Sequence, residues 1–156
     1  MTTIMARSAS FTSALKGGRP LILVVDDDDK SRKLAAEFLG VRGFDMAEAG
    51  DGEECLLQVA RRRPDLILLD MQMPRLGGIA TLRRLKNDTG MAAIPVVMLS
   101  ASAMPDEQEQ MRAAGCVAVL SKPVDLKELL TTVQEHLNAE VGSRSAGVVR
   151  GAVSGL

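Results

Sequence analysis

Carboxylates follow two apolar runs of the chain, and their spacing is the first indication of chemistry. The run LILVV at residues 21–25 leads into four successive aspartates, and the run LILL at residues 66–69 leads into Asp70. Short apolar runs of this kind are typical of buried strands. Carboxylates that converge at one sheet edge repel one another unless protons or a cation neutralise them. The pattern therefore indicates a divalent-metal site that contains an aspartate placed to react.

Alternating strands and helices are expected to position these groups. The pattern predicts strands at residues 21–25, 44–49, 66–69, 95–99 and 117–120, and helices at residues 30–41, 53–62, 79–86, 105–114 and 126–137. Apolar strands joined by helices imply a parallel sheet that is covered on both faces. We therefore expect an α/β fold, a doubly wound (βα)5 sandwich. Asp28 or Asp29 is expected to cap the first of these helices.

Polar residues stand at the carboxyl ends of four of the predicted strands. In doubly wound sheets the ligand site lies at these ends, near the point where the strand order reverses. The topology therefore predicts one shared site. Its candidate residues are Asp26, Asp27, Asp70, Ser100 and Lys122.

Composition excludes several classes of partner. The net charge of −1 offers no attraction to nucleic acid, and the chain has three Phe and no Trp or Tyr to stack on bases. No stretch approaches the roughly 20 apolar residues of a membrane span. Cys55 and Cys116 form no CxxC pair, which favours reduced cysteines and a cytoplasmic location. We expect a disordered leader at residues 1–19, one domain at residues 20–137 and a flexible tail at residues 138–156.

The ordered motifs resemble the CheY-like receiver domains of two-component response regulators. They are strand-Asp-Asp, strand-Asp-x-x-Met-Pro, strand-Ser-Ala and strand-x-Lys-Pro, and the resemblance covers residues 20–137. Residues 94–123 are particularly similar to short single-domain regulators of the bacterial cell-cycle type. The resemblance implies the flavodoxin-like fold, with a parallel sheet of order 2-1-3-4-5.

The resemblance also implies a Mg²⁺ site in the acidic cluster. Asp27 and Asp70 would bind Mg²⁺ directly, the backbone carbonyl of Gln72 would complete the protein ligands, and Asp26 would act through a metal-bound water. A cluster of hard oxygen atoms with few protein ligands suits Mg²⁺, which keeps several waters and accepts phosphate oxygen.

The remaining roles concern the phosphoryl group. By the resemblance, Asp70 would accept phosphate from a phosphohistidine, Ser100 would donate a hydrogen bond to it and Lys122 would pair with it. Because the attacked phosphorus is surrounded by negative oxygens, Mg²⁺ and Lys122 would reduce the repulsion that a carboxylate nucleophile meets. The peptide bond between Lys122 and Pro123 is typically cis in this family.

These roles predict a single-domain response regulator rather than an enzyme with a separate substrate. We expect its partners to be a histidine kinase or histidine phosphotransferase and a downstream protein that docks on the last strand and the helices beside it. The protein is expected to be a monomer or weak dimer.

Two alternatives stay open. Val119 stands where the family often has Tyr or Phe, so the chain could be a pseudo-receiver that binds partners without taking phosphate. Asp26 and Asp28 also form an Asp-x-Asp pair after a strand, as in phosphohydrolases of the haloacid dehalogenase type.

Overall fold

Strands and helices alternate along the chain in a computed structural model that describes residues 18–102 and 104–146. The strands are β1 (Leu21–Val25), β2 (Asp45–Ala49), β3 (Leu66–Asp70), β4 (Val96–Ser100) and β5 (Ala118–Ser121). The helices are α3 (Asp29–Gly40), α4 (Gly52–Arg61), α5 (Gly78–Asn87), α6 (Pro105–Ala113) and α7 (Leu126–Ala146).

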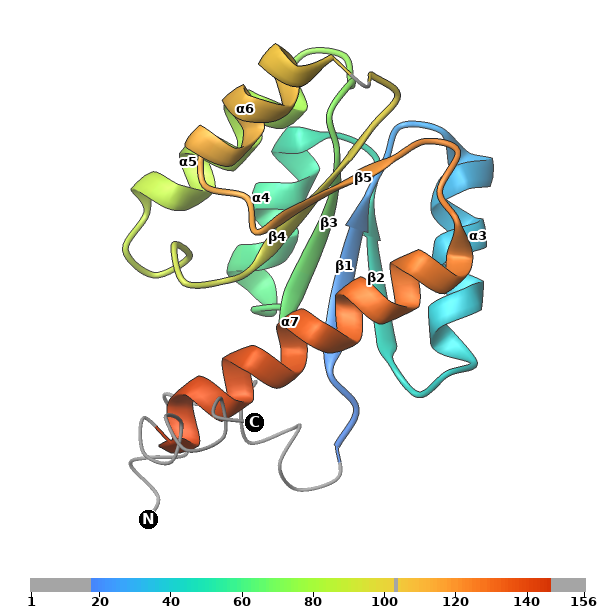
Figure 1. The fold of residues 1–156 in the computed structure, drawn as a ribbon, viewed down its shortest axis with the longest axis vertical. Helices are drawn as coiled ribbons and strands as arrows, with labels where there is room; N and C mark the ends of the chain where they lie inside the picture. Colours follow the sequence, from blue (N-terminus) through green and yellow to red (C-terminus); the bar gives the residue numbers. More distant parts are fainter. Residues whose placement is uncertain (1–17, 103, 147–156) are drawn as a thin grey trace.

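The five strands form one parallel sheet in the order β2-β1-β3-β4-β5 (Figure 1). This order confirms the predicted 2-1-3-4-5 topology. The chain moves from β1 to one side for β2 and to the other side for β3, so the strand order reverses between β1 and β3. In sheets of this type the ligand site lies at the carboxyl ends of the strands beside that reversal.

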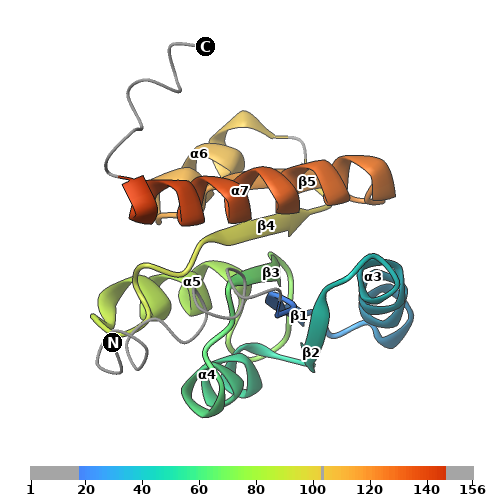
Figure 2. The same cartoon turned by 90° about the horizontal axis from the view of Figure 1, so that it is seen from below.

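Helices cover both faces of the sheet, and side chains from alternate strand positions supply two cores. One core contains Ile22 and Val24 of β1 and packs against α3 and α7. The other contains Leu23 and Val25 and packs against α4, α5 and α6. Figure 2 shows α3 on one side of the strands and α4 and α5 on the other. Because both faces of the sheet are buried, β1 is apolar throughout, and β3 is apolar up to its last residue, Asp70.

Most predicted helix ends differ from the structure by one residue, and the start of α3 is one of them. Asp28 occupies the N-cap position of α3 and Asp29 is the first helical residue, so the prediction that Asp29 could be the cap is wrong. The Asp28 carboxylate makes no capping bond to the backbone; instead it accepts a hydrogen bond from Ser31 Oγ at 2.8 Å. The Asp29 carboxylate forms an ion pair with Arg32.

The last helix is longer than the sequence predicts. A tail is expected from residue 138, but α7 continues to Ala146. Residues 138–146 contain one glycine and no proline, so an existing helix can propagate through them. The expected leader lies outside the described residues except for residues 18 and 19, as does the tail after residue 146. None of the helices in the described ranges has the length and hydropathy of a membrane span.

Candidate functional site

Three carboxylates meet where β1 and β3 end. Asp26, Asp27 and Asp70 each offer an oxygen atom, and these atoms all lie within 4.8 Å of one another. Asp26 and Asp70 are 2% and 4% exposed, whereas Asp27 is exposed to solvent. Hard oxygen donors gathered on one open side form a suitable partial shell for Mg²⁺, which retains water on its remaining positions.

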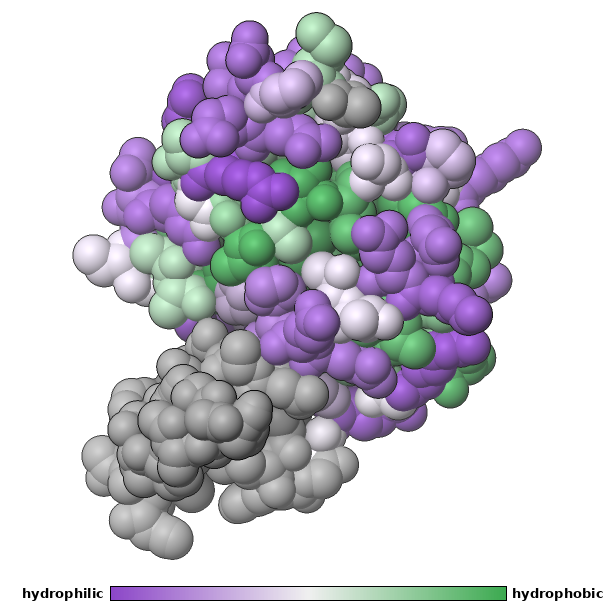
Figure 3. Space-filling model, in the orientation of Figure 1, coloured by the Kyte–Doolittle hydropathy of each residue, from purple (hydrophilic) through white to green (hydrophobic). Residues whose placement is uncertain are grey.

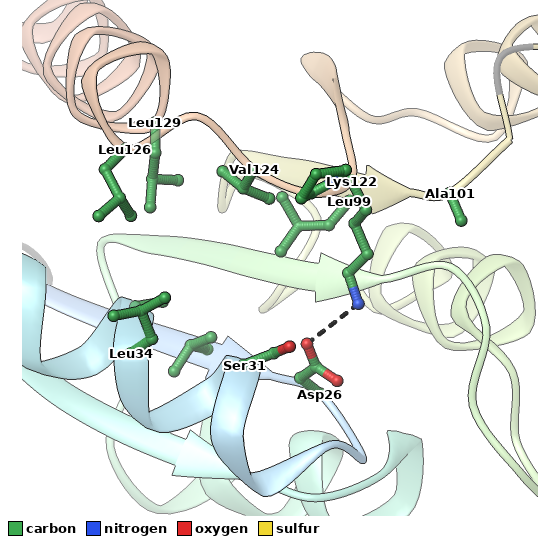
Figure 4. A pocket seen from close by; sticks show the side chains of 12 residues that line it. Asp26, Ser31, Leu34, Leu99, Ala101, Lys122, Val124, Leu126 and Leu129 are labelled. Carbon is green, nitrogen blue, oxygen red and sulfur yellow. Dashed lines mark hydrogen bonds and ion pairs between the residues drawn. The ribbon is translucent and has the colours of Figure 1, made fainter.

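Lys122 brings a positive charge to the same cluster. Its Nζ lies 3.2 Å from Asp26 Oδ2 and 3.2 Å from Asp70 Oδ1. Figure 4 shows the side chain reaching from the end of β5 toward Asp26 at the end of β1. The backbone N–H of Lys122 donates to the carbonyl of Ser100 at 2.8 Å, and the following peptide bond to Pro123 is cis, as the resemblance implies.

Burial and charge act against each other on the reactive carboxylate. Burial, followed by the charge of Asp26, raises the pKa of Asp70 from its ordinary value of 3.8 to about 6, although the Lys122 ammonium opposes this shift. Burial alone would lower the pKa of Lys122, but Asp70 and Asp26 outweigh it and raise that pKa. Lys122 therefore stays protonated and positively charged. A cation bound at the cluster would favour the ionised form of Asp70.

Ser100 ends β4 beside this cluster and is fully buried. In the sheet its neighbour Leu99 pairs with Asp70, and Ser100 itself pairs with Ser121. The Ser100 Oγ accepts a hydrogen bond from the backbone N–H of Ser102 at 3.1 Å. The Ser100 hydroxyl itself donates to the carbonyl of Ser102 at 3.4 Å, and a new acceptor at the site would compete with that donated bond.

The loop after Asp70 turns tightly across the end of β3. The backbone N–H of Gln72 points to the Asp70 carboxylate, with 3.3 Å between this nitrogen and Oδ1. The N–H of Gly78 donates to the carbonyl of Met71 at 3.0 Å and closes the loop. A Cβ atom at Gly78 would lie 2.4 Å from the Asp70 carbonyl oxygen, so the close approach requires glycine.

A cavity of about 460 Å³ opens beside the contact between Lys122 and Asp26. Figure 4 shows Leu34 of α3 and Leu126 of α7 on facing walls of this space. On the face of the molecule drawn in Figure 3, hydrophobic side chains are bordered by hydrophilic ones. The other lining residues are Val24, Ser31, Ala35, Leu99, Ala101, Pro123, Val124 and Leu129.

Four of the five residues predicted from strand ends meet in one cluster, and the fifth, Ser100, ends the neighbouring strand β4. Three further residues shape the site although the sequence analysis did not single them out. Arg32 contacts the backbone of Asp26, and Gly78 permits the tight loop after Asp70. Arg75 of that loop adopts a positive φ of 62° and pairs with Asp51. The Gly77-Gly78 pair was a visible signal for the loop, whereas the two arginine contacts join segments that only the folded sheet brings together.

Comparison with known proteins identifies the family. The family model for the response regulator receiver domain matches residues 22–134. The chain belongs to the response regulator receiver family. Receiver domains are signalling modules of two-component systems, so the family and fold predicted from the motifs are both confirmed.

Relatives and solved structures agree with this membership. The receiver is 32% identical over 116 residues to the polar-differentiation response regulator DivK of Brucella anthropi, across 74% of this chain and 94% of that protein. It resembles chemotaxis protein CheY4 of Vibrio cholerae with a TM-score of 0.72 and 27% identity, covering 76% of this chain and 98% of the other. The receiver domain of Francisella response regulator 1452 gives a TM-score of 0.73 and 30% identity, covering 77% and 98%.

The receiver family argues against the phosphohydrolase alternative, and the geometry agrees. That alternative needs the carboxylates of Asp26 and Asp28 to act together on a substrate. The Asp28 carboxylate is bonded to Ser31, and Asp28 approaches Asp26 through its backbone N–H, with 2.9 Å between this nitrogen and Oδ1. The carboxylate that does share the cluster with Asp26 and Asp27 is Asp70.

Proposed function

We propose that this receiver accepts a phosphoryl group on Asp70 in a Mg²⁺-dependent reaction and that phosphorylation switches its docking to other proteins. The phosphoryl donor would be a histidine kinase or a histidine phosphotransferase. The single observation that carries the proposal is the position of the Lys122 ammonium, 3.2 Å from Asp70 within a three-carboxylate cluster. A phosphate on Asp70 would meet a fixed positive charge there.

The acidic cluster fits Mg²⁺. Asp27 and Asp70 would bind it directly, Asp26 would act through a water, and the carbonyl of Gln72 would add a fourth protein group. When bound, Mg²⁺ would offset the charge of the carboxylates and of the phosphoryl oxygens. The solvent exposure of Asp27 leaves one side of the cluster open to water and to an incoming phosphate.

Different protein groups would take different roles in the phosphoryl transfer. An Asp70 carboxylate oxygen forms a bond to phosphorus while the bond from phosphorus to the donor imidazole nitrogen breaks, and the electron pair of that bond returns to the imidazole. Lys122 stays protonated throughout and pairs with the phosphoryl oxygens. Burial of Asp70 limits solvation of the nucleophile, so fixed charges of the site replace part of its water shell.

Ser100 would link the chemistry to the surface. To donate to the new phosphoryl group, the Ser100 hydroxyl would give up its bond to the Ser102 carbonyl, which would shift the loop that leads into α6. The half-buried Val119 of β5 is smaller than the family's usual aromatic residue, so the loop itself would carry more of the change. Exposed apolar side chains near α6 and β5, Met104 and Val117, are suited to a protein partner.

The test is the intact mass of the purified chain after incubation with acetyl phosphate and Mg²⁺. We expect the gain of one phosphoryl group, absent in Asp70→Asn and absent when a chelator removes Mg²⁺. No gain in the wild type would support the pseudo-receiver alternative instead. The single-domain organisation, the cytoplasmic location and the monomeric or weakly dimeric state stay predictions.

A further inference from the structure

Arg32 lies in the first turn and a half of α3, next to the acidic cluster but outside it. Its side chain is only 13% exposed, which is unusual for a surface helix of this polarity. Each guanidinium nitrogen has a different partner. Nη1 donates to the carbonyl oxygen of Asp26 at 2.8 Å, Nε to Glu48 Oε1 at 2.9 Å and Nη2 to Asp29 Oδ1 at 2.6 Å.

The contact with Asp26 is the important one, because this carbonyl belongs to the peptide bond that joins Asp26 to Asp27. The other groups of Asp26 are also held. Its N–H donates to the carbonyl of Ala49 at 3.1 Å, and its carboxylate accepts bonds from the backbone of Asp28 and from Lys122. Arg32 therefore orients the peptide group that connects Asp26 to the exposed Asp27.

We propose that Arg32 is a positioning residue for cation binding, which sets the direction of Asp27 through the Asp26–Asp27 peptide. The inference rests on the proposed function of the site as a Mg²⁺-dependent phosphoacceptor. The planar guanidinium is suited to this task because its donors are fixed relative to one another. Glu48 of β2 and Asp29 of α3 anchor the two nitrogens that do not contact Asp26.

The charge of Arg32, taken alone, would affect Mg²⁺ affinity in the opposite direction to its positioning role, so the two can be told apart by experiment. A positive side chain close to a cation site weakens binding of the cation by repulsion. If Arg32 acted only as a charge, its removal would tighten Mg²⁺ binding. If it positions the ligands, removal weakens binding even though a positive charge has gone.

The test is a calorimetric Mg²⁺ titration of the full chain and of four variants. We expect Arg32→Gln and Arg32→Lys to lose roughly 10- to 100-fold in Mg²⁺ affinity, the range found when groups that orient metal ligands are removed. Lysine keeps the charge but cannot reach three partners at once. Glu48→Gln, which weakens the anchor of Nε, is expected to lose affinity in the same direction but by less.

Lys33→Met is the matched control, since Lys33 follows Arg32 on α3 and also contacts Glu48, at 3.4 Å. Within the described part of the chain, its side chain makes no hydrogen bond to Asp26. We expect its Mg²⁺ affinity to stay within about twofold of wild type, because an exposed charge contributes little. Urea unfolding of every variant without Mg²⁺ shows whether the fold is retained. If Arg32→Gln does not fold, Arg32→Lys carries the test, because it keeps the charge and changes only the donor geometry.

Two results would overturn the inference in different ways. Wild-type affinity in Arg32→Lys together with tighter binding in Arg32→Gln would assign Arg32 a purely electrostatic effect and leave the proposed function intact. Failure of the wild-type chain to bind Mg²⁺ at all would remove the proposed function as well.

Discussion

The ammonium of Lys122 lies 3.2 Å from the carboxylate of Asp70, although the strand between them, β4, separates β5 from β3 in the sheet. The lysine side chain spans the end of this strand, and its Nζ also contacts Asp26 at 3.2 Å. A flexible four-carbon stem that carries a compact charge is suited to such a reach. One cationic group thus serves both buried carboxylates of the acidic cluster.

Lys122→Met is expected to slow phosphorylation by acetyl phosphate by about 10²- to 10³-fold, the usual cost of removing a group that stabilises developing charge. The rate can be followed by intact mass over time in saturating Mg²⁺. Lys127→Met is the control, because Lys127 is exposed at the start of α7 and is expected to leave the rate unchanged. Equal rates in Lys122→Met and wild type would contradict the assigned role.

Asp70→Asn is expected to stabilise the Mg²⁺-free fold at pH 7 by roughly 1–3 kcal/mol. The pKa of Asp70 is raised from 3.8 to about 6 by burial and by Asp26, so the folded state holds this proton more tightly than the unfolded state. The stability that the proton contributes is present below the unfolded pKa and is lost as the pH rises toward the folded pKa. The stability difference between variant and wild type should therefore shrink as the pH falls to about 4.

Urea unfolding in the presence of a chelator, at several pH values from 4 to 7, measures this difference. A difference that stays constant over the whole pH range would show that the pKa of Asp70 is not raised in the folded state.

Gly78→Ala is expected to destabilise the fold by about 1–3 kcal/mol, the usual cost of overpacking. The new Cβ would lie 2.4 Å from the Asp70 carbonyl oxygen and 2.6 Å from Met71 Cα, both of which are backbone atoms. Gly77→Ala is the matched control, because its Cβ would meet nothing closer than 3.9 Å and its φ of −72° is ordinary. Its cost should stay below about 1 kcal/mol. Similar losses in urea unfolding for the two variants would refute the close-approach argument.

Ser100→Ala is expected to leave Asp70 able to accept phosphate but to reduce the conformational response. Amide chemical shifts of the loop before α6 and of β5 should change on phosphorylation in the wild type and change much less in the variant. Ser121→Ala is a suitable control, since Ser121 pairs with Ser100 across the sheet but is exposed. A full set of shift changes in Ser100→Ala would assign the response to another residue.

The sheet and the cluster at its edge could be predicted because each depends on local patterns. Apolar runs locate the strands, and the topology rule places Asp26, Asp70 and Lys122 at one edge. Strand ends were less certain, as Asp70 and Ser100 prove to be the last residues of their strands rather than the first ones after them. Ladder hydrogen bonds extend one residue beyond the apolar run, and hydropathy does not report them.

The features of the site that could not be predicted from the sequence depend on contacts between distant segments. Arg32 pairs with Glu48 across the gap between α3 and β2, and nothing in the spacing of these two residues indicates their contact. The space around Gly78 is likewise set by the carbonyl of Asp70, which only the folded loop brings near. At the end of α7, by contrast, a helix already formed continues through residues with no strong signal of their own.

The most direct test of the account is chemical mapping of the phosphorylated residue. The wild-type chain is phosphorylated with acetyl phosphate and Mg²⁺ and then reduced with borohydride, which converts an aspartyl phosphate to homoserine; the peptides are sequenced by mass spectrometry. The account predicts homoserine at position 70 and unmodified aspartate at positions 26, 27 and 28. Modification at position 26 or 28 with Asp70 unchanged would contradict it.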